Sequence, residues 1–206
     1  MLSALFGCFA GPVVAAHAAP AGDSAQTLLP RLALQQGELI APDGVGGNSL
    51  GMSVAVSGNT ALVGAPYCDV AGNVVAGAAY VFVRSGGAWV AQAKLTAADG
   101  ADLDLFGYSV ALSGDTALIG AMGLGRRPGA AYVFALSAGS WTQRARLRAF
   151  DGVAGDEFGR RVALSVDTAL IGAPGHDIAG KQFAGATYVF ARFGASWLQQ
   201  ARLIAP

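Results

Sequence analysis

The stretch FGYSVALSGDTALIGA, which runs from Phe106 to Ala121, occurs in two further versions in this chain. LGMSVAVSGNTALVGAP covers residues 50–66, and FGRRVALSVDTALIGAP covers residues 158–174. The Gly-Ala pairs that close the three versions are separated by 56 and then 52 residues. A period of roughly 50 residues is typical of architectures in which one small β-sheet is repeated radially. We therefore expect one sheet per repeat.

A second sequence motif follows each version of the first. This motif begins with Tyr-Val-Phe and ends with Trp, and it covers residues 80–89, 132–141 and 188–197. The loop between the two motifs differs in length, because residues 122–129 are four fewer than the corresponding residues 66–77 and 174–185. Surface loops tolerate such changes in length, whereas the strands they connect do not. Each repeat is therefore expected to hold fixed strands and one variable loop.

The first motif predicts a β-hairpin. In the middle repeat, residues 109–113 and 116–121 flank Gly114-Asp115, a two-residue turn in which glycine adopts positive φ. The register that this turn imposes leaves both faces apolar or small, so we expect the hairpin to be buried on both sides. The third repeat has Val166 at the position of Gly114, and a β-branched residue fits poorly where φ is positive.

Two further strands complete each repeat. Residues 130–136 are an apolar run, and residues 140–149 alternate between two faces, one of which carries Arg144 and Arg146. Charged side chains on an outer strand discourage pairing with stray strands. No segment shows a period of 3.6 residues. The predicted fold is therefore all-β, with propeller-type blades of four antiparallel strands.

Composition excludes several classes of protein. The 206 residues contain 13 Lys plus Arg and 13 Asp plus Glu, so no basic surface for nucleic acid is indicated. Hydrophobic residues make up 53% of the chain, which is too many for a disordered protein. The 30 glycines fit a fold with many short turns, and they show no collagen period.

The N-terminus predicts export. Residues 1–18 are apolar and end in Ala16-His17-Ala18, a pattern of small residues typical of a signal-peptidase site, and residues 19–30 read as a linker. A membrane anchor is the alternative, although glycine and proline interrupt the apolar run. Cleavage would remove Cys8 and any membrane span, and would leave Cys68 without a disulfide partner. We expect a secreted, periplasmic or surface location in a bacterium.

Two short motifs, Phe-Gly and Gly-Ala-Pro, resemble the FG-GAP repeat, a family known from the head of integrin α-chains and from many bacterial exported proteins. Each motif occurs twice, as Phe106-Gly107 and Phe158-Gly159, and as Gly64-Ala65-Pro66 and Gly172-Ala173-Pro174. Leu50 replaces the phenylalanine in the first repeat, and Met122 replaces the proline in the second. Over residues 31–206, the resemblance implies four-stranded propeller blades used for extracellular binding or adhesion. It implies no particular ligand.

The repeats divide the chain into blades and one remainder. Blade 1 is expected over residues 43–97, blade 2 over 98–149 and blade 3 over 150–206. Residues 31–42 match the end of a repeat and predict an orphan outer strand with no blade before it. Because propellers usually close with about four to eight blades, three blades predict a partial or open propeller. We therefore expect either self-association through the end blades or a place in a longer propeller.

The search for catalytic residues is negative. Residues 51–55 and 107–111 imitate the Gly-x-Ser-x-Gly nucleophile elbow, but the third repeat has Arg161 at the serine position. Beyond the predicted signal peptide, His176 is the single histidine, so no repeated Ser-His pair exists. We therefore expect a protein that is not an enzyme.

The acidic residues between blades have two interpretations. Asp99, Asp102, Asp104, Asp151, Asp156 and Glu157 supply oxygen atoms of the kind that calcium prefers. Aspartate before glycine also forms turns without any ion. Integrin-like blades bind calcium in the hairpin between the first two strands, and those hairpins are too short here to enclose an ion. We expect no cofactor, with calcium as the alternative.

Two groups of residues are candidates for contact with a ligand. The tryptophans Trp89, Trp141 and Trp197 suit either packing between blades or platforms for sugar rings. The variable loops carry Asp69, Asn73, Asp177 and Lys181. We expect a binding or surface-interaction module for a protein or a glycan. The alternatives are a scaffold within a larger surface protein or enzyme, and a propeller lectin.

Overall fold

A computed structural model describes residues 37–124 and 127–205, and their regular secondary structure is entirely β-strand. Residues 35–206 form one compact unit. The all-β expectation is thereby confirmed. The predicted signal peptide (residues 1–18), the linker (19–30) and the first part of the orphan strand (31–36) lie outside the described residues.

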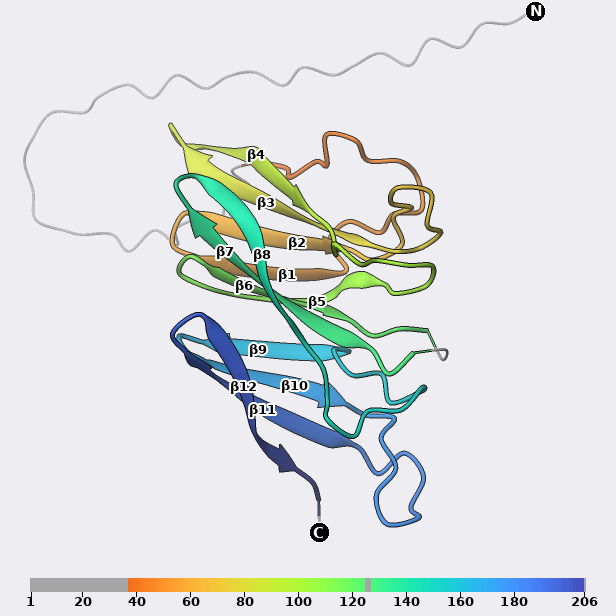
Figure 1. The fold of residues 1–206 in the computed structure, drawn as a ribbon. Coiled ribbons are helices and arrows are strands. Elements are labelled where there is room, and N and C mark those ends of the chain that lie inside the picture. The colour runs from red at the N-terminus through yellow and green to blue at the C-terminus, as the bar shows by residue number, and fades with distance from the viewer. Residues whose placement is uncertain (1–36, 125–126, 206) are drawn as a thin grey trace, which may run out of the picture. The chain divides into compact units, whose positions relative to one another are not determined.

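The described residues form three four-stranded antiparallel sheets, blades 1 to 3, in which strands pair in chain order (Figure 1). Blade 1 contains β1 (Ser53–Ser57), β2 (Thr60–Ala65), β3 (Ala78–Ser85) and β4 (Ala88–Leu95). Blade 2 contains β5 (Phe106–Ser113), β6 (Thr116–Ala121), β7 (Ala130–Ser137) and β8 (Ser140–Leu147). Blade 3 contains β9 (Arg161–Ser165), β10 (Thr168–Ala173), β11 (Ala186–Phe193) and β12 (Ser196–Leu203). These blades do not close into a ring.

The predicted hairpin register is confirmed in blade 2. Leu112 pairs with Ala117 and Ser109 pairs with Gly120 across β5 and β6. Nearly all of both strands is buried or half-buried, because blade 2 has a neighbour on each side. In the end blades, β1 and β9 alternate between half-buried and exposed residues. The hairpin as a whole is therefore buried on both sides in blade 2 alone, although β2 of blade 1 is also buried along nearly its whole length.

A phenylalanine seals each junction between blades. Phe106 is fully buried in a cluster with Leu62, Val81 and Leu95 of blade 1. Its ring also meets Tyr132 at 5.4 Å between centroids, an arrangement of ring edge to ring face that aromatic pairs prefer. Phe158 repeats these contacts between blades 2 and 3. The two junctions form the main hydrophobic cores of the domain.

Main-chain hydrogen bonds hold the same two junctions. The Phe106 N–H donates to the Ala76 carbonyl at 2.8 Å, and the Phe158 N–H donates to the Pro128 carbonyl at 2.8 Å. Gly77 and Gly129 form isolated parallel bridges with these phenylalanines. Each blade is therefore joined to the next through backbone as well as side chains.

The glycine of the Gly-Ala pair is required where the next blade passes. A Cβ on Gly64 would lie 2.0 Å from the Gly107 carbonyl oxygen, and one on Gly120 would lie 1.9 Å from that of Gly159. Only glycine permits so close an approach of two backbones. At the equivalent Gly172, the nearest atom to such a Cβ is 3.7 Å away, because no described blade follows blade 3.

The expected orphan outer strand over residues 31–42 is wrong for its described part. Residues 37–42 form no strand. A β-strand needs a neighbour to pair its backbone groups, and the described residues offer none at this position. Leu39 and Ala41 instead pack against a blade 1 cluster that includes Val63 and Tyr80.

We predict that Gly120→Ala destabilises the domain, because the new methyl group would collide with the Gly159 carbonyl. Such overpacking typically costs about 1–3 kcal/mol. Gly172→Ala is the matched control at the same position of β10, and it should leave the free energy of unfolding nearly unchanged. Urea unfolding followed by tryptophan fluorescence measures both variants. Equal effects would contradict the close approach of blades 2 and 3.

We also predict that Val166→Gly stabilises blade 3. Val166 has a φ of 50°, close to the 57° of Gly58 and the 54° of Gly114, so the expected positive φ is confirmed. Relief of this backbone strain should raise the free energy of unfolding by about 1 kcal/mol. The reciprocal variant Gly114→Val should lower it by a similar amount. Thermal unfolding measures both, and a Val166→Gly variant with a lower melting temperature would contradict the idea.

Candidate functional site

Each blade carries one cluster of an aspartate, a tyrosine and a basic residue. In blade 3, the Tyr188 hydroxyl donates to Asp151 Oδ1 at 2.8 Å, and Arg202 donates to Asp151 Oδ2. The aspartate precedes the first strand of the blade, the tyrosine lies on the third strand, and the base lies on the fourth. The equivalent sets are Asp43, Tyr80 and Lys94 in blade 1, and Asp99, Tyr132 and Arg146 in blade 2.

The clusters hold a charged carboxylate beside a neutral phenol. Burial is the main cause that raises the pKa of Tyr80, Tyr132 and Tyr188, and the neighbouring carboxylates add to it. Hydrogen bonds from Lys94 and Tyr80 lower the pKa of Asp43. Burial alone would raise the pKa of Asp151, but the hydrogen bond from Tyr188 and the charge of Arg202 outweigh it. The tyrosines therefore act as hydrogen-bond donors.

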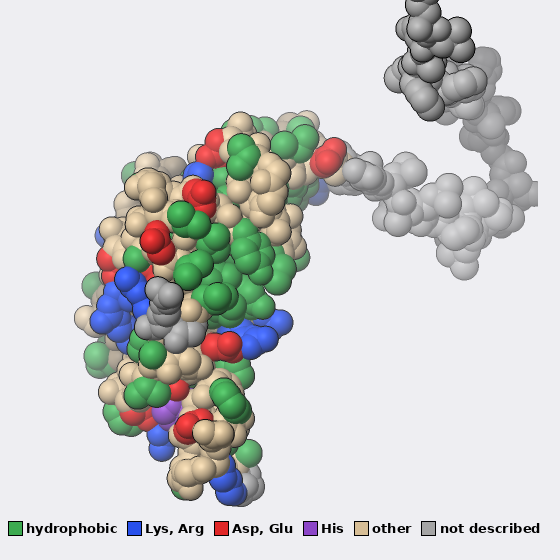
Figure 2. All heavy atoms as spheres, turned by 90° about the vertical axis from the view of Figure 1, so that its right-hand side faces the viewer, with side chains coloured by type: hydrophobic (Ala, Val, Ile, Leu, Met, Phe, Trp, Pro, Cys, Tyr) green, Lys and Arg blue, Asp and Glu red, His purple; other side chains and the backbone are tan. Residues whose placement is uncertain are grey.

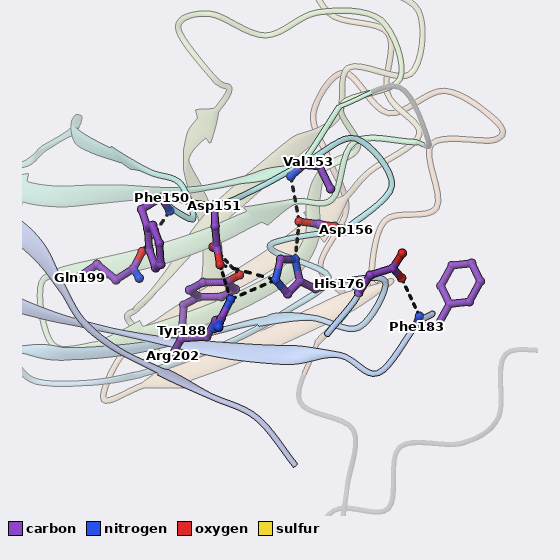
Figure 3. A network of polar contacts seen from close by, with 10 residues as sticks. Phe150, Asp151, Val153, Asp156, His176, Phe183, Tyr188, Gln199 and Arg202 are labelled. Atoms are coloured by element: carbon purple, nitrogen blue, oxygen red, sulfur yellow. Dashed lines mark hydrogen bonds and ion pairs between the residues drawn. The ribbon is translucent and has the colours of Figure 1, made fainter. Parts of the chain in front are cut away.

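His176 extends the cluster of blade 3 (Figure 3). Its Nδ1 lies 2.8 Å from Asp156 Oδ2, and its Nε2 lies 3.6 Å from Asp151 Oδ2. Asp156 is 2% exposed, and it also accepts a hydrogen bond from the Val153 N–H at 2.9 Å. The imidazole therefore links the loop before blade 3 to the loop after β10.

The other blades place different residues where His176 lies. The sequence equivalent in blade 1 is Cys68, a buried free thiol whose pKa is raised by burial. In blade 2, where the loop is shorter, Arg127 lies 3.4 Å from the buried carboxylate of Asp104. A hollow of about 220 Å³ beside this pair is also lined by Tyr132, Arg146 and Arg148. Asp99 and Asp104 offset two of its three arginines.

The structure gives each predicted calcium ligand a protein partner. Asp99 and Asp151 belong to the clusters above, and Glu157 pairs with Arg160. The remaining three carboxylates accept backbone N–H groups: Asp102 from Val74, Asp104 from Ala101 and Asp156 from Val153. In the part of the chain that the structure describes, no group of three or more His, Cys, Asp or Glu side chains is arranged to hold a metal ion. The expectation of no cofactor, with calcium as the alternative, stays a prediction.

The predicted loop residues mostly shape their own loops. Asp69 accepts the Val75 N–H and Asp177 accepts the Phe183 N–H, each at 2.8 Å. The Asn73 amide donates to the Gly100 carbonyl at 3.2 Å, which ties this loop to the start of blade 2. Lys181 is exposed. A role in ligand contact stays a prediction for all four residues.

The three tryptophans are half-buried and pack against the cores. Trp89, Trp141 and Trp197 each contact a different hydrophobic cluster. The Trp141 indole N–H also donates to the Gln92 side chain of blade 1 at 3.0 Å. These contacts favour packing over open platforms for sugar rings: Trp141 and Trp197 pack at the junctions between blades, and Trp89 packs on the blade 1 cluster.

One edge of the domain gathers the long loops, at the right in Figure 1, opposite the tight hairpins. We call it the loop edge; it contains residues 43–52, 66–77, 96–105, 122–124, 127–129, 148–160 and 174–185. The Leu103 N–H donates to Val74 and the Leu124 N–H donates to Leu103, both at 2.9 Å, so loops of neighbouring blades are joined. The exposed large apolar side chains on this edge are Val45, Met52, Tyr67, Val74, Leu124, Phe150, Val153 and Phe183.

Figure 2 views the loop edge and shows hydrophobic side chains between groups of charged ones. The most exposed of them near a variable loop tip is Phe183, at 75%. An apolar surface framed by charge is typical of a site for protein contact.

The polar clusters were not among the predicted sites, although the sequence carries a signal for them. A basic residue follows the tyrosine by 14 residues in all three repeats, and an Asp-Gly pair precedes each first strand. The aspartates alone suggested turns or calcium. What was missing was the contact between residues of different strands, which spacing alone does not reveal.

Comparison with protein families finds the FG-GAP repeat in residues 34–82, 89–134 and 141–190, which together exceed half of the chain. Each matched stretch ends on the third strand of a blade. The second and third begin on the outer strand of the preceding blade, and the first begins before residues 37–42. The sequence repeat therefore spans the junction between blades. A search of curated proteins found no match.

We predict that stability falls in acid. The folded state holds the pKa of Asp43 and Asp151 below the usual value, so their contribution is present above the unfolded pKa of about 4 and is lost as the pH falls through the folded value. Asp151→Asn should weaken this dependence and lower neutral-pH stability by about 1 kcal/mol. Urea unfolding from pH 7 to pH 3 measures both. A flat profile for the unmodified chain would contradict the prediction.

Proposed function

Because the chain belongs to the FG-GAP repeat family, we propose that it is an exported, non-enzymatic interaction module that binds its ligand through the loop edge. The proposal is carried by a contrast between two groups of residues, those that recur in every blade and those that differ. The aspartate, tyrosine and base that recur in every blade are bonded to one another, whereas the exposed loop tips differ from blade to blade. Contact specificity therefore resides in the loops.

The polar groups of the domain support binding rather than catalysis. His176 and Asp156 are a pair of the kind that general-base chemistry uses, but they are 6% and 2% exposed and bond to each other. Ser53 Oγ donates to the Gly107 carbonyl at 2.8 Å, and Ser109 Oγ accepts the Val162 N–H at 3.0 Å. These serines, which imitate a nucleophile in sequence, hold neighbouring blades together.

The character of the loop edge favours a protein ligand over a glycan. Val74, Leu124 and Phe183 are 53%, 49% and 75% exposed on loops of three different blades. Apolar side chains of this kind bury well against another protein. Of the tryptophans, which a lectin would need as open platforms, Trp141 and Trp197 pack between blades, and Trp89 packs on the blade 1 cluster outside the loop edge.

Export is the second part of the proposal. FG-GAP repeats typically occur in extracellular proteins, and the sequence begins with a predicted signal peptide. Among residues 37–124 and 127–205, no helix is long and apolar enough to cross a membrane. The family and the predicted signal peptide are the grounds on which we propose a location outside the cytoplasm of a bacterium, in the periplasm, at the cell surface or in the medium.

A paired screen tests the function. The purified chain is applied to a glycan array and used to select from a phage-displayed random peptide library, each in calcium and in chelator. We expect selected peptides, no retained glycan and no effect of calcium. Val74→Ser, Leu124→Ser and Phe183→Ser together should weaken peptide binding at least about tenfold, equivalent to 1.4 kcal/mol.

The matched control removes exposed apolar side chains from the outer strands instead. Val90→Ser and Leu198→Ser replace residues that are 51% and 52% exposed, and they should leave binding unchanged. Glycans retained without any selected peptide would replace the protein ligand with a carbohydrate. Equal losses in both variants would remove the loop edge from the proposal.

A further inference from the structure

The outer face of blade 3 repeats a surface that is buried twice elsewhere in the chain. Leu62, Val81 and Leu95 of blade 1 are at most 4% exposed in the cluster that holds Phe106. Their counterparts in blade 2 are buried in the cluster that holds Phe158: Leu118, Val133 and Leu147. In blade 3, the counterparts Leu170 and Leu203 are 38% and 52% exposed.

The backbone of blade 3 also lacks the contacts that blades 1 and 2 make with the blade that follows each of them. The carbonyls of Ala76 and Pro128 accept N–H groups from the following blade, whereas the equivalent Ala184 carbonyl receives no hydrogen bond from the described residues. Gly172 and Gly185 likewise lack the close backbone contact that fills their counterparts. We call Leu170, Gly172, Ala184, Gly185, Val189 and Leu203 the acceptor face.

Blade 1 presents the complementary surface at the other end of the domain. Val54 and Val56 are 69% and 67% exposed. Their counterparts in blade 2 are Val110, which is 8% exposed, and Leu112, which is half-buried, because both pack in the cluster shared with blade 1. An apolar hollow of about 470 Å³ opens here, lined in part by Val54, Val56, Val63 and Trp89. An exposed apolar surface of this kind is a site for association.

The segment that would dock is already in its docked conformation. Ser49 and Gly51 have φ of 53° and 95°. The corresponding values at the filled junctions are 54° and 91° for Leu105 and Gly107, and 57° and 93° for Glu157 and Gly159. Binding would therefore require little ordering of this backbone. We call Ser49, Leu50, Gly51, Val54 and Val56 the donor face.

We propose that the acceptor face of one copy of this chain binds the donor face of a second copy, with the contacts that join blades 1 and 2. We take the bound partner to be a second copy for one reason. The chain forms this junction twice, and its described residues also present one uncovered acceptor face and one uncovered donor face. Such a contact is head-to-tail, and it closes when two copies bind each other at both ends. Two chains would then complete a ring of six blades, within the usual range of four to eight.

The two faces share Ser49, Leu50, Gly51, Ala184 and Gly185 with the loop edge, but they do not include Val74, Leu124 or Phe183, the side chains proposed to contact the ligand. The association also has a competitor within the chain. Residues 39–42 and 203–206 share the sequence Leu-Ile-Ala-Pro. Leu39 and Ala41 pack on blade 1 as Leu95 and Ala97 pack on blade 2. In the dimer, Leu203 of one copy would occupy the position on blade 1 of the other copy that Leu39 already occupies. We therefore expect a reversible, concentration-dependent dimer.

Sedimentation velocity over a range of protein concentrations tests the proposal. The unmodified chain should shift from the mass of one chain to the mass of two. An acceptor variant (Leu170→Glu, Leu203→Glu) and a donor variant (Val54→Glu, Val56→Glu) should each raise the dissociation constant at least about tenfold, because association would bury their charges. All four positions are exposed, so the variants should fold, which circular dichroism checks.

Mixing the two variants distinguishes this contact from any other dimer. Each variant keeps one intact face, so equal amounts should form a pair that contains one chain of each. Phe150→Glu with Val153→Glu, a control on exposed apolar residues outside both faces, should dimerise normally. A single-chain mass at every concentration, dimers that survive in both variants, or failure of the variants to pair would each overturn the proposal.

Discussion

The fold depends on one contact, the passage of a Phe-Gly segment across the Gly-Ala pair of the preceding blade. At this point two backbones approach more closely than any side chain allows, as the 1.9 Å between a Cβ built on Gly120 and the Gly159 carbonyl shows. The approach brings the phenylalanine into a core made by both blades and aligns its N–H with a waiting carbonyl. The close backbone approach, the buried phenylalanine and the backbone hydrogen bond therefore all occur at one place. This explains why the Phe-Gly and Gly-Ala motifs recur in the sequence.

The polar residues of the repeat serve the same junctions. An aspartate carried by the chain before a blade is bound by a tyrosine and a base from that blade, which fixes how the connecting loop enters the sheet. The three tyrosines are at most 2% exposed, and a buried hydroxyl needs such a partner, since burial without one would be costly. The aspartates are consequently occupied by structure. The exposed residues of the loop edge differ between blades, and this surface is available for contact with a ligand.

Repetition within one chain produces unequal blades. Blade 2 has a neighbour on each side, whereas blades 1 and 3 each have one face that no described blade covers. The unfilled faces keep the residues and backbone conformation of the filled ones, since every blade is built from one repeated sequence. Leu170 is thus a core residue by pattern and a surface residue by position. Apolar surface of this kind favours association in water.

The sequence by itself determined the strands, the hairpin register, the four-stranded blade and the strained turn at Val166. Those features are local: a two-residue turn and an alternating pattern fix them within a few residues. Tertiary structure decided the rest. Residues 37–42 form no strand because no neighbour pairs with them, and the aspartates join tyrosines that lie more than 30 residues away in sequence. Such contacts depend on how blades pack, which local patterns do not encode.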